Sequence, residues 1–191
     1  MLRKWRTQQS CKRLAKLTSP RRGLRRVLAL EDALRILLVV DASNLTRFEQ
    51  VMRYAQELKQ QRKHVLVCAF TQEKKPAETL VLRQDLIVIG PESVDWFYRP
   101  KNYPGEVVWN FQADYLIDCS VEPCLTLLWV VKRSRAGLKV SFLPDGYNVF
   151  DITILLPESP WPDQVAELTR RLRALSGPGV QATKTPATLG R

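Results

Sequence analysis

Three aspartates stand where carboxylates could meet and do chemistry. Asp41 and Asp118 each end an apolar run that fits a strand buried on both faces, and Asp145 lies in the turn 144–147. Ligands of an open α/β sheet sit beyond the carboxyl ends of its strands. Three carboxylates at that edge could hold Mg²⁺ or Mn²⁺, as in a metal-dependent nuclease or phosphohydrolase. The alternative, which the turn chemistry favours, is that Asp41 and Asp118 only cap the turns after their strands.

Other catalytic arrangements find little support. The single histidine, His64, would have to serve any Ser-His-Asp or Cys-His site, but it opens a strand, at the edge away from the expected crevice. Neither GxGxxG nor GxxxxGK[ST] occurs, and no zinc-ligand spacing exists. Helix amino termini at 43–46 or 122–125 could still hold an anion. The favoured interpretation therefore involves no cofactor and no metal, and it describes a binding module more than an enzyme.

The four cysteines favour a reducing compartment and predict a cytoplasmic protein. They form no CxxC pair, and Cys68 and Cys119 fall inside predicted strands, where a free cysteine acts as a small hydrophobic residue. No apolar run reaches the length of a membrane span, and no signal-peptide core follows Met1.

Positive charge is concentrated in one arm. Residues 1–26 hold ten basic residues and no acidic one, whereas the remainder holds 20 basic and 19 acidic residues, although the whole chain carries +11. Such a block typically engages nucleic acid, an acidic partner or an anionic membrane. We predict RNA or the ribosome as the partner. The candidate residues are Arg3, Lys4, Arg6, Lys12, Arg13, Lys16, Arg21, Arg22, Arg25 and Arg26.

The arm could be a short basic helix, a solvated disordered segment or a transit peptide. In a helix over 2–17, Leu2 and Trp5 lie on one side and Leu14 lies nearly opposite. Basic residues surround the helix, which argues against a helix lying on a membrane. It also weakens the transit-peptide interpretation, although an Arg-rich segment without acids fits that composition.

Aromatic residues gather between 96 and 111. Interleaved with Arg99 and Lys101, they could stack on nucleic-acid bases. The favoured alternative is that they cover a sheet edge. The six are Trp96, Phe97, Tyr98, Tyr103, Trp109 and Phe111.

The elements that position these residues follow from hydrophobic periodicity. The stretch 113–143 reads as strand, apolar helix and strand, and a right-handed parallel crossover is its expected form. Residues 91–112 look irregular, and the turn at 144–147 predicts an antiparallel edge hairpin between 138–143 and 148–156. The other expected strands are 34–40, 64–70 and 85–89, and the other expected helices are 45–62 and 160–175.

Together these elements predict one α/β domain over 27–175. We expect a three-layer, Rossmann-like, mostly parallel sheet with an antiparallel edge hairpin. The basic arm 1–26 precedes it through a linker at 18–26, and a flexible tail 176–191 follows.

Four pieces of the sequence resemble an uncharacterised family of small Bacteroidota proteins. They are DWFYRPKN (95–102), FQADYLIDCS (111–120), KRSRAGLKVSF (132–142) and NVFDITI (148–154), and the basic N-terminal helix also fits. The resemblance implies a bacterial cytoplasmic protein without an assigned activity, so it implies no site residues.

Two shorter stretches are similar to enzyme families. ILLVVDASNL (36–45) resembles the first strand of PIN- and NYN-like nucleases, where the Asp that ends the strand binds metal. Residues 113–143 are similar to the first Rossmann half of glycosyltransferases, whose second half this chain is too short to hold.

Overall fold

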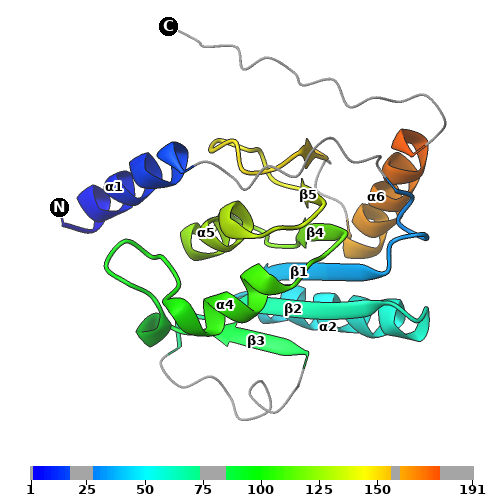
Figure 1. The fold of residues 1–191 in the computed structure, drawn as a ribbon, viewed down its shortest axis with the longest axis horizontal. Helices are drawn as coiled ribbons and strands as arrows, with labels where there is room; N and C mark the ends of the chain where they lie inside the picture. The colour runs from blue at the N-terminus through cyan, green and yellow to red at the C-terminus, as the bar shows by residue number, and fades with distance from the viewer. Residues whose placement is uncertain (1, 18–27, 74–84, 156–159, 177–191) are drawn as a thin grey trace, which may run out of the picture.

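The computed structural model describes residues 2–17, 28–73, 85–155 and 160–176, which form a parallel sheet between two helix layers (Figure 1). Its strands follow the order β3-β2-β1-β4-β5-β6, and all pairings are parallel. The predicted three-layer α/β fold is confirmed. The strands are β1 (Arg35–Asp41), β2 (His64–Phe70), β3 (Leu86–Ile89), β4 (Tyr115–Asp118), β5 (Leu138–Ser141) and β6 (Ile152–Thr153).

The helices cover both faces of the sheet. One core cluster joins α2 and α6 to the first face, and the other joins α1, α4 and α5 to the second. The described helices are α1 (Leu2–Lys16), α2 (Leu45–Gln60), α4 (Asn102–Asn110), α5 (Leu125–Arg133) and α6 (Trp161–Leu175), with the 3-10 turn η1 (Pro91–Ser93).

Strands β1 and β2 lie inside the sheet and have five consecutive buried residues each. A strand covered on both faces needs no polar alternation, which explains its continuous apolar sequence. Chain order reverses between β1 and β4, so the ends of these strands are the expected crevice of the sheet.

Helix α5 forms the centre of the second layer, as its apolar sequence predicts. Seven of its nine residues are buried, including Trp129 and Lys132. The turn into β5 needs a glycine, because a Cβ at Gly137 would lie 2.8 Å from the carbonyl oxygen of Asp114.

The predicted antiparallel hairpin between 138–143 and 148–156 is wrong, because β6 pairs with β5 in parallel. The turn signal belongs to a loop instead: the Asp145 carboxylate accepts hydrogen bonds from three backbone N–H groups of that loop. The loop returns the chain to the start of β5, where Lys139 and Asp151 hydrogen-bond to each other. The next strand therefore enters in the same direction as β5.

Residues 91–112 are more regular than expected, because they contain η1 and α4. Pro104 and Gly105 hid the helix from the sequence pattern. Pro104 is the third residue of α4, in the first turn, where a missing N–H breaks no helical hydrogen bond.

Several predicted segments lie outside the described residues. These are the linker 18–26, most of the charged loop 72–78, and the tail beyond residue 176.

Candidate nucleic-acid interface

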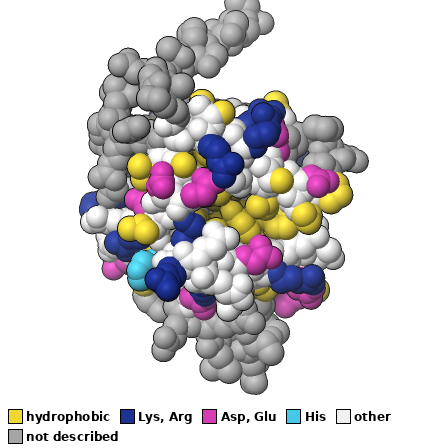
Figure 2. Space-filling view, turned by 90° about the vertical axis from the view of Figure 1, so that its right-hand side faces the viewer, with side chains coloured by type: hydrophobic (Ala, Val, Ile, Leu, Met, Phe, Trp, Pro, Cys, Tyr) yellow, Lys and Arg dark blue, Asp and Glu magenta, His cyan; other side chains and the backbone are white. Residues whose placement is uncertain are grey.

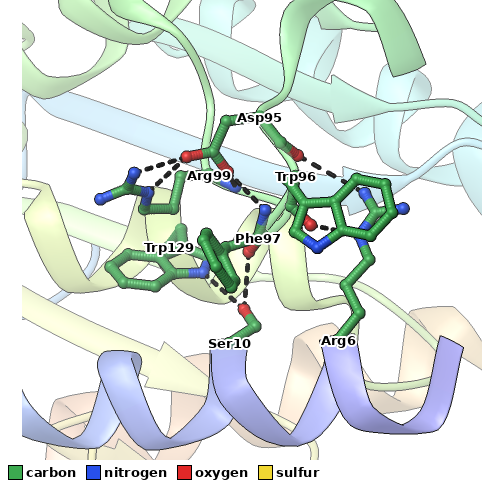
Figure 3. A network of polar contacts seen from close by, with 7 residues as sticks. All are labelled: Arg6, Ser10, Asp95, Trp96, Phe97, Arg99 and Trp129. Carbon is green, nitrogen blue, oxygen red and sulfur yellow. Dashed lines mark hydrogen bonds and ion pairs between the residues drawn. The ribbon is translucent and has the colours of Figure 1, made fainter. Parts of the chain in front are cut away.

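Helix α1 is docked on the domain. Ser10 and Leu14 are both fully buried, and Leu14 belongs to the core cluster that includes α5. The Ser10 hydroxyl donates to the carbonyl oxygen of Phe97 at 2.7 Å and accepts from the indole N–H of Trp129 at 3.0 Å (Figure 3). These contacts tie α1 both to α5 and to the loop before α4. The basic arm therefore contributes to the core at these two positions.

Two arginines of α1 contact the domain in this docked position. Arg6 donates to the carbonyl oxygen of Trp96 and lies over its ring (Figure 3), with 4.9 Å between the guanidinium carbon and the ring centre. The same carbon lies 4.0 Å from the ring centre of Tyr98. The guanidinium of Arg13 lies 3.7 Å from the ring centre of Phe97. Planar guanidinium groups stack well on aromatic faces, so these two charges hold the helix in place.

The loop that receives them is itself held by Asp95. Its carboxylate accepts from the backbone N–H of Phe97 at 2.8 Å and of Arg99 at 2.9 Å, and it pairs with the Arg99 guanidinium at 2.6 Å. Burial opposes ionisation of this carboxyl, but the hydrogen bonds from Arg99 and Phe97 outweigh it and lower the pKa of Asp95. The charged form of Asp95 therefore fixes the loop.

The lysines of α1 point away from the domain. Lys4, Lys12 and Lys16 are all exposed, and at 100° per residue they fall on the half of the helix away from Ser10 and Leu14. Salt bridges are found elsewhere in the described residues, but none of them involves these lysines. The exposed side of α1 is therefore a row of hydrated positive charges.

Another face of the molecule carries charges of both signs. Figure 2, which views the side at the right of Figure 1, shows basic and acidic side chains interspersed around a band of apolar ones. The exposed lysines of α1 differ from that mixed face in carrying charge of one sign.

The other predicted arm residues can be placed only in part. Arg3 belongs to α1. Arg21, Arg22, Arg25 and Arg26 lie outside the described residues.

The aromatic residues at 96–111 differ in burial. Trp109 is buried and Phe111 packs on the second core cluster. Trp96, in contrast, is 52% exposed.

Asp41 and Asp118 meet at the expected edge. They end the neighbouring strands β1 and β4, and Ser120 bridges them. The Ser120 hydroxyl accepts from the backbone N–H of Asp41 at 3.2 Å, and the Ser120 N–H donates to the Asp118 carboxylate at 3.0 Å. Asp41 in turn accepts from the N–H of Ser43 at 2.9 Å. Both carboxylates thus organise the turns that follow their strands.

Asp118 differs from Asp41 in its burial. Only 3% of Asp118 is exposed, and burial raises its pKa to about 6; the Ser120 hydrogen bonds lower it in part and the charge of Asp41 raises it. Such a carboxyl can exchange a proton near neutral pH.

A metal site gains no support in the described ranges. Among those residues, no group of three or more His, Cys, Asp and Glu side chains is placed to hold a metal ion. The third predicted acid, Asp145, binds its own loop.

The remaining reactive side chains are unremarkable in position. His64 is exposed at the start of β2, and all four cysteines are free thiols. None of the helices in the described part of the chain has both the length and the apolar character needed to cross a membrane.

Sequence reasoning missed the docking face of α1. Arg6, Ser10, Arg13, Leu14 and Leu17 recur at spacings of three and four, which places them on one side of a helix. That stripe could have been found, but only two of its members are apolar.

Comparison with known proteins assigns the chain to a family through one match. The model of a family described as "Family of unknown function (DUF6913)" matches residues 4–175. The curated proteins and the solved structures gave no match.

Proposed function

Because the chain belongs to the family of unknown function DUF6913, its role must be argued from its own surface, and we propose a non-enzymatic module that binds RNA through α1. The observation that carries this proposal is the sorting of charge on the helix. Arg6 and Arg13 face the domain and stack on its aromatic rings, while Lys4, Lys12 and Lys16 face outward. Ammonium groups on an exposed helix face are suited to neutralising phosphates.

Docking improves this surface as a binding site. A disordered arm loses conformational entropy when a partner orders it, and this loss weakens binding. Helix α1 is ordered by Leu14 and by the Ser10 hydrogen bonds before any partner arrives. Its lysines are therefore presented at fixed spacing.

The proposed recognition is of backbone charge. Lysines on phosphates position a protein on its partner but do not read bases. RNA, free or within the ribosome, offers a dense line of phosphates. A cytoplasmic location suits a protein that binds RNA. The four free thiols support that location, because thiols stay reduced there.

The test is the salt dependence of binding. The Lys4→Gln/Lys12→Gln/Lys16→Gln variant removes three charges that have no packing role. If each lysine neutralises one phosphate, the slope of log K against log salt on single-stranded RNA should become shallower by about 2. Fluorescence anisotropy of a dye-labelled strand at several salt concentrations measures both slopes.

A matched control removes the same charge elsewhere. Arg53, Arg62 and Arg170 are exposed and belong to the opposite layer or its connections. Their triple Gln variant should keep the wild-type slope. Equal loss of slope in the two variants would reject α1 as the site, and an unchanged slope in the lysine variant would do the same.

A further inference from the structure

Two of the five tryptophans are set apart by exposure. Trp109, Trp129 and Trp161 are 7%, 4% and 6% exposed, whereas Trp5 and Trp96 are each 52% exposed. Isolated apolar residues on a surface need no explanation. Two half-exposed indoles at one end of a basic helix are less ordinary, because an indole left in water forgoes a large gain from burial.

Arg6 places these two indoles at the same end of α1. It directly follows Trp5 in the helix, donates to the Trp96 carbonyl oxygen and lies against the Trp96 ring (Figure 3). Lys4, exposed, precedes Trp5. This end of the helix therefore combines two aromatic surfaces with an exposed cation.

The Trp96 ring is held before any ligand arrives. Its loop is fixed by Asp95, which binds the N–H groups of Phe97 and Arg99. The backbone of Tyr98, at φ 62°, completes the tight turn. The guanidinium of Arg6 lies over the rings of both Trp96 and Tyr98. A ring fixed in this way loses little entropy when a ligand stacks on it.

We propose that Trp5 and Trp96 stack on unpaired bases, so that the ligand of α1 is single-stranded nucleic acid. The inference rests on the proposed function, since the lysines supply the contacts to phosphate. Indoles accept any base, which gives affinity without sequence preference. Paired bases are stacked within a duplex and offer no free face. Acidic proteins and anionic membranes lack bases altogether.

The test compares three probes of equal length. They are a dye-labelled single strand, its abasic counterpart with the same phosphates, and the duplex of that strand. Wild-type protein should bind the base-containing strand at least tenfold more tightly than the abasic strand, because stacking contributes substantially for each base. The Trp5→Ala/Trp96→Ala variant should lose at least tenfold affinity for the base-containing strand and none for the abasic one. The Trp5→Phe/Trp96→Phe variant should recover much of that loss.

Controls separate stacking from folding and from the proposed function. Leu45 is 66% exposed on α2, so Leu45→Ala removes an exposed apolar residue elsewhere and should not alter affinity. Thermal melting checks that each variant is folded. Equal wild-type binding to the base-containing and abasic strands would overturn stacking and leave charge binding by α1 intact. Equal losses on both probes in the Ala variant would also overturn it. Absence of binding to every probe would overturn the proposed function itself.

Discussion

Asp118 shows what burial does to a single residue at this sheet edge. It shares the β1–β4 edge with Asp41 and hydrogen-bonds Ser120, yet its pKa stands at about 6 mainly because it is buried. The unfolded chain would titrate near 3.8. Between these values the folded state holds the proton more tightly than the unfolded state. The contribution of Asp118 to stability is therefore lost as pH rises from about 4 to 6.

Replacing Asp118 with Asn should remove this penalty. The amide oxygen can still accept from the Ser120 N–H, but the side chain carries no charge. The rise of the Asp118 pKa to about 6 corresponds to about 3 kcal/mol above that pH. We expect Asp118→Asn to increase the free energy of unfolding by up to that amount at pH 8 and by little at pH 4, as measured by urea denaturation. A gain that does not depend on pH would contradict this origin.

For single residues of the arm, the sequence reveals the charge but not the contacts with the domain. Counting predicts ten cations, but it cannot tell which of them face the domain. Arg6 and Arg13 stack on rings supplied from residues 96–98, and these rings are brought to α1 only by the fold. The spacing of residues within α1 can mark one face of the helix, but it cannot reveal that rings from residues 96–98 receive that face.

At the scale of elements, α5 is the support on which α1 lies. Trp129 is 4% exposed and donates to Ser10, so the same side chain fills the core and anchors the neighbouring helix. Trp129→Ala should cost about 3–5 kcal/mol through the cavity it leaves. Guanidinium denaturation measures this cost. Trp96→Ala, at a half-exposed site, should change the free energy of unfolding far less. A Trp129 variant as stable as its parent would show that α5 does not need this ring.

Elements with strong periodicity were predictable, and those governed by distant contacts were not. The central strands and α2, α5 and α6 appear where apolar spacing places them. The hairpin prediction was wrong because the sequence around Asp145 fits either a tight turn or a longer loop capped by its carboxylate. Only tertiary contacts select the capped loop. Helix α4 was not predicted because Pro104 and Gly105, which typically interrupt helices, stand beside only a short apolar run. The placement of Asp41 and Asp118 at one edge of the sheet could be predicted, because each ends an apolar run that fits a buried strand.

At the scale of the whole molecule, charge and packing are combined in one arm. Residues 1–26 carry nearly all of the net charge of +11. The same arm supplies Leu14 to the core and Ser10 to Trp129. Deleting the arm therefore changes two properties at once, whereas replacing its three exposed lysines changes only charge.

Comparing the two changes gives the last prediction. A chain of residues 27–191 has 20 basic and 19 acidic residues, so it should lose most of its affinity for single-stranded RNA. It should also be destabilised, because burial of a leucine side chain contributes about 1.5–3 kcal/mol and the buried Trp129 N–H would lose its acceptor. The triple lysine variant should lose affinity but unfold at the same urea concentration as the wild type. If the truncated chain also unfolds there, docking of α1 contributes no stability. If the lysine variant is destabilised like the truncated chain, its lysines support the fold.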